Sequence, residues 1–63
     1  MNYYNIRYYL VLLPDGDIEI RKTDVYMSST EYDVVWHKSY NMGEDLKENL
    51  LLAYEAWENY YGY

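Results

Sequence analysis

The sequence contains no cysteine or phenylalanine, one proline, three glycines and only five lysine or arginine residues among 63. Without cysteine, the chain has no disulfides, no thiolate-bound zinc and no thiol nucleophile. Eleven aspartates and glutamates outweigh the five cations and leave a net charge of −6, so we expect no direct binding to nucleic acid. The longest uninterrupted apolar run, 8–13, is six residues long. Because a membrane helix needs about 20, we expect no membrane segment.

What the chain does contain is apolar and aromatic: 51% of its residues are hydrophobic, and it has eleven tyrosines and two tryptophans. So many aromatic residues argue against disorder, and the length allows one small domain spanning 1–63. A domain of this size buries only about 60% of its extended-chain surface, which favours a homodimer. The first residues lack a basic region followed by an apolar one. We therefore expect a cytoplasmic protein.

Alternating apolar residues predict a first strand over 3–13. The following segment, Pro14–Asp17, predicts a hairpin turn, because proline presets the first turn angle and Gly16 accepts a positive φ. A second strand is expected from Ile18 to about Met27. Its alternation changes phase, which indicates a bulge near 21–24 or an early end of the strand.

A third strand is expected over about 31–40, followed by a helix over about 44–61. Asn41 is the predicted N-cap, with Glu44 reaching back to it, and Gly62 is the predicted C-terminal cap. The third strand should place on one face Tyr32, Val34, Trp36 and Tyr40, and on the other Asp33, Val35, His37 and Ser39. The helix should turn toward the sheet Leu46, Leu50, Ala53, Tyr54, Trp57 and Tyr61. The predicted fold class is α+β: a three-stranded antiparallel β-meander with one C-terminal helix packed on one face (β-β-β-α).

Most of the excess negative charge falls on the predicted helix, where Lys47 is the only cation. Four carboxylates should lie opposite the apolar stripe: Glu44, Glu48, Glu55 and Glu58. At a rise of 1.5 Å per residue they span roughly 21 Å, a length that fits several consecutive phosphates. Asp15 and Asp17 extend this row if the hairpin lies on the same side. The alternative interpretation is an ordinary solvated helix face.

A single helix leaves the second face of the sheet open, and in this chain that face is too apolar for a simple solvated surface. The residues expected to mediate self-association there are Tyr3, Tyr9, Val11 and Val35. Docking of a different protein is one alternative, and a plain tyrosine-covered surface is another.

No catalytic, metal or cofactor site is expected. His37 is the only histidine, and Asp33 lies about 13 Å away along the predicted strand, too far to share a metal ion. The segment 15–17 holds two carboxylates but lacks the length and further ligands of a calcium loop. We therefore expect a protein that is not an enzyme.

In composition the chain resembles virus- or plasmid-encoded inhibitors that imitate nucleic acid, being small, acidic, rich in tyrosine and free of cysteine. That resemblance implies a non-catalytic inhibitor that blocks the basic nucleic-acid-binding site of a host defence or DNA-processing protein. One alternative is a homodimeric structural or interaction module that uses its tyrosine-rich sheet face. Another is an immunity-type antitoxin for a basic enzyme, which shares the same electrostatics.

Overall fold

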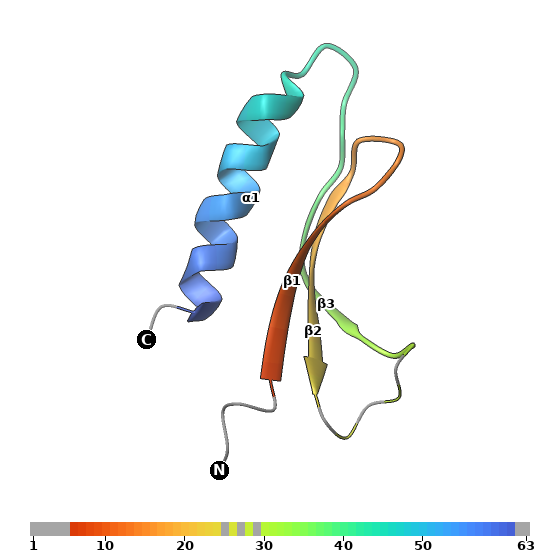
Figure 1. Ribbon diagram of the computed structural model, residues 1–63. Helices are drawn as coiled ribbons and strands as arrows, with labels where there is room; N and C mark the ends of the chain where they lie inside the picture. Colours follow the sequence, from red (N-terminus) through yellow and green to blue (C-terminus); the bar gives the residue numbers. More distant parts are fainter. Residues whose placement is uncertain (1–5, 25, 27, 29, 62–63) are drawn as a thin grey trace.

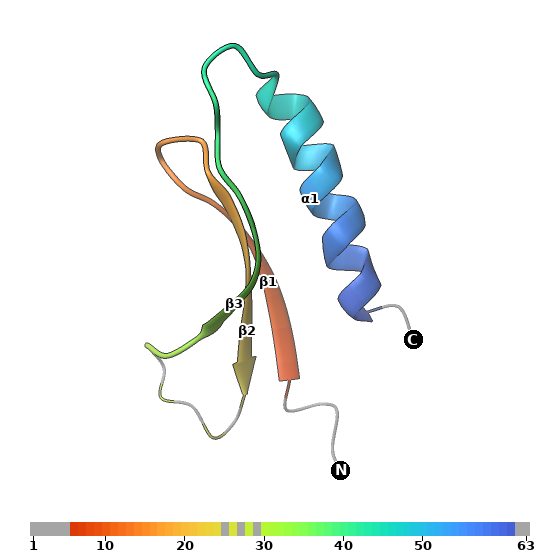
Figure 2. The same cartoon turned by 180° about the vertical axis from the view of Figure 1, so that it is seen from behind.

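The fold is the β-β-β-α arrangement that the sequence predicts. A computed structural model describes residues 6–24, 26, 28 and 30–61. Its elements are β1 (Ile6–Leu12), β2 (Ile18–Asp24), β3 (Asp33–Lys38) and α1 (Leu46–Tyr61). The strands form one antiparallel sheet in the order β1-β2-β3, and α1 lies across one face of it (Figure 1). Seen from behind, the other face of the sheet carries no further element of the described chain (Figure 2).

The hairpin between β1 and β2 follows from its turn residues. Gly16 N–H donates to the Leu13 carbonyl at 3.0 Å, and Leu13 N–H donates to the Asp17 carbonyl at 2.8 Å. Gly16 has a φ of +96°, which a glycine adopts without steric cost. The Asp15 side chain also accepts a hydrogen bond from Asp17 N–H at 3.0 Å, which closes the turn from within. The predicted turn at 14–17 is confirmed.

The sequence left open a bulge near 21–24 or an early end of the second strand, and β2 ends at Asp24. The bulge of the sheet lies in β3. Ile20 pairs with Trp36 and Arg21 pairs with Val34, which leaves Val35 as the extra residue. The bulge reverses the side-chain alternation of β3 at this point. Trp36 therefore shares the helix-covered face with Ile20, whereas Val34 shares the open face with Arg21. The prediction that Val34 and Trp36 share a face is wrong for this reason.

The core of the described chain is small and lies between β2 and the middle of α1. Three apolar side chains are fully buried, those of Ile18, Ile20 and Ala53, and Asn49 is buried beside them. Leu46, Leu50 and Trp57 are half-buried on the same side of the helix, as predicted. Tyr54 is the exception, because its ring lies at the flank of the helix against Trp57, 5.7 Å between centroids. The Tyr61 side chain is outside the described residues.

The helix begins later than predicted and with a different cap. Asn41 to Glu44 form a separate turn, in which Gly43 has a φ of +92° and Glu44 N–H donates to the Asn41 carbonyl at 3.0 Å. The left-handed Gly43 keeps the chain out of the helix, so the cap is Asp45, which accepts from Lys47 N–H at 3.0 Å. Glu44 does reach back to Asn41 N–H, at 2.8 Å, as predicted. The predicted C-cap, Gly62, lies outside the described residues.

Within the described residues, α1 is too short and too polar to cross a membrane.

Candidate functional site

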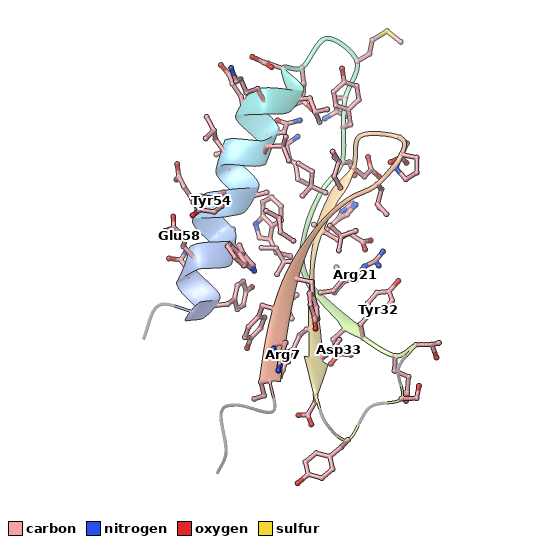
Figure 3. All side chains as sticks on the ribbon, in the orientation of Figure 1. Arg7, Arg21, Tyr32, Asp33, Tyr54 and Glu58 are labelled. Atoms are coloured by element: carbon pink, nitrogen blue, oxygen red, sulfur yellow. The ribbon has the colours of Figure 1, made fainter. Side chains whose placement is uncertain are left out.

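The side of α1 that points away from the sheet carries several exposed carboxylates. We call the side that carries Glu48, Leu51, Leu52, Glu55 and Glu58 the outer helix face, and all five residues are exposed. At roughly 100° of rotation per residue, Leu52 lies at its edge, and the exposed Lys47 and Asn59 belong to the same side of the helix. Figure 3 shows Glu58, with Tyr54 nearby at the flank, projecting from the helix on the side away from the strands.

The three carboxylates of this face differ from most other acids of the chain in having no partner among the described residues. Seven of the eleven acidic side chains accept a hydrogen bond within the molecule: Asp15, Asp17, Glu19, Asp24, Glu31, Glu44 and Asp45. Glu48, Glu55 and Glu58 accept none and form no ion pair within the described part of the chain. Their charge is therefore available to an external cation.

Glu44 does not belong to the outer helix face, contrary to the sequence prediction. It lies in the connection before α1, half-buried, and its Oε2 is 3.1 Å from Lys38 Nζ. The hydrogen bond from Asn41 N–H lowers the pKa of Glu44, and the Lys38 ammonium lowers it further. Glu44 Oε1 also accepts from Asn49 Nδ2 at 3.4 Å. The Glu44 carboxylate thus links the segment between β3 and α1 to Lys38 of β3 and to Asn49 of α1.

Asp17 does not extend the row either, and Asp15 accepts a hydrogen bond from Asp17 N–H within the hairpin turn. Asp17 Oδ1 accepts from Tyr40 N–H at 2.8 Å, and Asp17 Oδ2 is 3.7 Å from Nε2 of His37. His37 pairs with Glu19, whose neighbours Ile18 and Ile20 are buried under α1. His37 therefore belongs to the open face of the sheet. Asp17 is directed toward that face, on the opposite side of the sheet from the outer helix face.

Two leucines stand among the free carboxylates, and the sequence analysis missed them. Leu51 is 60% exposed and Leu52 is 52% exposed. The signal was present, because three consecutive leucines at 50–52 span about 200° of a helix and cannot all face one sheet. The outer helix face therefore combines apolar and acidic groups.

The open sheet face is a second surface of interest. By strand register it carries Tyr9, Val11, Arg21 and Val34, with Tyr32 just before β3. The Arg21 guanidinium lies 4.2 Å from the centre of the Tyr32 ring, and Arg21 Nε donates to Glu19 at 2.8 Å. Figure 3 shows Arg21 and Tyr32 on the side of the sheet away from α1.

Of the four residues predicted for self-association, the structure brings Tyr9 and Val11 together on β1. Val35 is half-buried in the bulge of β3, and its neighbour Val34 takes the position on the open face. Tyr3 lies outside the described residues.

The described residues contain no group of three histidine, cysteine or acidic side chains close enough to hold a metal ion. His37 lies beside Asp17 and Tyr40, and Asp33 pairs with Lys22 farther along β3, so these two candidates are not brought together.

Comparison with known proteins gives no relative for this chain. No protein-family model matches it, and no match was found among curated proteins or solved structures. The account of function therefore depends on the surfaces described above.

Proposed function

We propose that this protein is a non-catalytic inhibitor that occupies the basic nucleic-acid-binding site of another protein with the outer helix face. The observation that carries the proposal is the gathering of three unpartnered carboxylates, Glu48, Glu55 and Glu58, on one side of α1. A host defence or DNA-processing protein is the expected target. The inhibitor is expected to be encoded by a virus or mobile element and to act in the host cytoplasm.

The spacing of these carboxylates suits a site built for phosphates. Glu48 and Glu58 are ten residues apart, so their side chains are separated by roughly 15 Å along the helix axis. One strand of a duplex carries about four phosphates over that length. A groove lined with lysine and arginine meets the three carboxylates without rearrangement, because α1 is a rigid element.

The leucines add a contact that free phosphates lack. Leu51 and Leu52 lie between Glu48 and Glu55 in sequence and are exposed beside them. Nucleic-acid-binding sites pair their cations with apolar and aromatic groups that receive the bases. Leu51 and Leu52 provide apolar contact where the target otherwise receives bases. Binding therefore combines a salt-sensitive contribution from the carboxylates with a salt-resistant contribution from the leucines.

Keeping these acids has a cost to the helix, which supports a role for them outside the fold. Glu55 and Glu58 are three residues apart, and like charges at this spacing destabilise a helix by a few tenths of a kcal/mol. Glu58 also lies in the last turn of α1, where the helix dipole favours cations and where the chain has no basic residue.

Two other functions use one of the two exposed surfaces described above. An immunity-type antitoxin for a basic enzyme uses the same carboxylates and differs only in the target. A homodimeric structural module uses the open sheet face instead, where Tyr9, Tyr32 and Val34 are exposed. The two faces lie on opposite sides of the molecule, so variants of one face separate the two accounts.

The proposal is tested by immobilising the chain and identifying the proteins that it retains from a host-cell lysate. We expect one basic nucleic-acid-binding protein, released by high salt and by competing DNA. The variant Glu48→Lys/Glu55→Lys should lose this protein while keeping its circular dichroism spectrum.

The matched control is Asp24→Lys/Asp33→Lys, which changes two acids of the sheet. Each reversal adds two charges, so either pair brings the net charge from −6 to −2. The control should still retain the target. Equal loss in both variants contradicts a specific face and indicates binding by net charge alone. Retention of no protein by the wild-type chain contradicts the inhibitor proposal.

A further inference from the structure

The two faces of the sheet are used unequally. The helix-covered face supplies the buried isoleucines, whereas Tyr9, Tyr32 and Val34 remain exposed on the open sheet face. Tyrosine and arginine are enriched where proteins bind one another, and Arg21 stacks on Tyr32 at the centre of this face. The described core contains only three fully buried apolar side chains. A partner on the open face adds a second apolar layer to this small core.

The edges of the sheet are less suitable than its face for this contact. Leu13 and Asp17 form a hydrogen-bonded pair between the two strands. Because hydrogen-bonded and non-hydrogen-bonded pairs alternate along an antiparallel ladder, Tyr8 is in a non-hydrogen-bonded pair, and its N–H and C=O groups point away from β2, toward the free edge of the sheet. There the Tyr8 carbonyl accepts a hydrogen bond from Trp57 Nε1 at 3.0 Å. On β3, the Val35 bulge interrupts the edge, and the Val35 carbonyl accepts from the Tyr60 hydroxyl at 3.1 Å. Both edge strands are thus blunted against strand addition.

The charges of the open face are complementary to a second copy of itself. Arg7 lies at one end of β1, opposite Thr23. Glu19 and Asp17 lie at the other end, beside the hairpin, where Glu19 also pairs with Arg21 and Asp17 accepts from Tyr40 N–H of the same chain. A two-fold axis that lies across the strands turns the copies head to tail, so Arg7 of each copy approaches the acidic end of the other. An axis along the strands brings like ends together and lacks this complementarity.

From these observations we infer that the open sheet face binds a second copy of this chain, sheet against sheet, with the strands of the two copies antiparallel. The dimer has four layers, α/β/β/α, with Tyr9, Arg21 and Val34 at its centre. Both outer helix faces remain exposed, on opposite sides of the assembly. The inference does not depend on the proposed inhibitor function, because it uses the other side of the molecule.

Sedimentation equilibrium of the full chain tests this inference. We expect a mass twice the monomer's 7.7 kDa at micromolar concentration. Tyr9→Asp should weaken the dimer by about tenfold or more, because it buries a carboxylate at the interface. Tyr54→Asp is the matched control, since Tyr54 is 49% exposed and Tyr9 is 46% exposed. The control should leave the mass unchanged. If Tyr9→Asp does not fold, Val34→Asp makes the same test on β3.

The geometry is tested with single cysteines, because the natural chain has none. Arg21→Cys, at the centre of the face, should form a disulfide-linked dimer on mild oxidation, whereas Leu51→Cys on α1 should not. Arg7→Glu should weaken the dimer by about tenfold through repulsion from the partner's acidic end. A monomeric mass at all concentrations overturns the inference. Dissociation by Tyr54→Asp, or cross-linking through position 51, overturns it in favour of a helix-mediated dimer.

Discussion

The indole Nε1 of Trp57 donates a hydrogen bond to the backbone carbonyl of Tyr8 at 3.0 Å, which joins α1 to the free edge of β1. Three residues later, the Tyr60 ring stacks on the Tyr8 ring with centroids 4.8 Å apart. The Tyr60 hydroxyl donates to the Val35 carbonyl in β3. One turn of the helix therefore contacts both outer strands, and its aromatic side chains supplement a small aliphatic core.

Replacing Trp57 with phenylalanine removes the indole donor and keeps an aromatic ring. We expect the free energy of unfolding to fall by about 1–2 kcal/mol, because the Tyr8 carbonyl loses a partner and packing volume is lost. Urea unfolding followed by circular dichroism measures the change. Trp36→Phe is the control, since the Trp36 indole makes no hydrogen bond within the described chain. Equal losses in the two variants contradict a specific contribution from the hydrogen bond.

The two turn glycines should differ in their tolerance of alanine. Both have positive φ, but a Cβ on Gly16 meets Cγ of Tyr40 at 2.9 Å, whereas a Cβ on Gly43 meets nothing within 4 Å. Gly43→Ala should lower the free energy of unfolding by about 1 kcal/mol through backbone strain alone. Gly16→Ala should lower it by about 1 kcal/mol more than Gly43→Ala does, because the clash with Tyr40 is added. Thermal unfolding gives both values. In a Tyr40→Ala background, which removes the ring and keeps Cβ at 3.1 Å, most of the extra cost of Gly16→Ala should disappear. An unchanged extra cost contradicts the clash with the ring.

Glu44 should make stability depend on pH in the acidic range. The hydrogen bond from Asn41 N–H and the Lys38 ammonium lower its pKa below the ordinary value of 4.5. The unfolded chain therefore binds this proton more readily than the folded chain, so ionised Glu44 stabilises the fold above pH 4.5. This contribution is lost as the pH falls through the folded-state pKa.

The measurement is urea unfolding of wild type and Glu44→Gln between neutral and strongly acidic pH. We expect the variant to be less stable at neutral pH, with a difference that shrinks below pH 4.5. Glu31 provides a comparison, because the hydrogen bond from Ser28 N–H lowers its pKa as well. Glu31→Gln should likewise lower the stability at neutral pH by an amount that shrinks at acidic pH, and Lys38 takes no part in this effect. A difference for Glu44→Gln that is constant with pH is inconsistent with this role.

The outer helix face should be a place where substitution improves stability. Glu58→Lys converts a repulsive pair with Glu55 into an attractive one and places a cation in the last turn of α1. We expect a gain of about 0.5–1 kcal/mol, or a few degrees in Tm. Glu58→Gln, which only removes the charge, should give about half the gain. A loss of stability in the lysine variant indicates an internal role for Glu58 and argues against a face reserved for a partner.

The sequence predicts the fold because its signals are local and strong. Alternation defines β1, Pro14 and Gly16 define the hairpin, and a helical stripe defines α1. The sequence did not reveal the bulge in β3, because β3 reads equally well in either phase. Only the pairing of Ile20 with Trp36 decides which valine is extra. Such a choice depends on contacts between strands, and one strand's sequence does not contain them.

The candidate site was predictable only in part. Glu48, Glu55 and Glu58 follow directly from helical periodicity. Glu44 and Asp17 were misassigned because each is bound by a residue from another element, Lys38 and Tyr40 respectively. Charge counting treats all acids alike. The structure separates those that hold the fold together from those that remain free.

The central claim is that the outer helix face occupies a site otherwise used by nucleic acid. The most direct measurement takes the protein retained from the lysate, binds it to a fluorescein-labelled oligonucleotide, and follows anisotropy while this chain is added. We predict that the wild-type chain lowers the anisotropy to that of the free oligonucleotide, whereas Glu48→Lys/Glu55→Lys leaves it high. An anisotropy that stays constant or rises with the wild-type chain means that both ligands bind at once, and it contradicts the account.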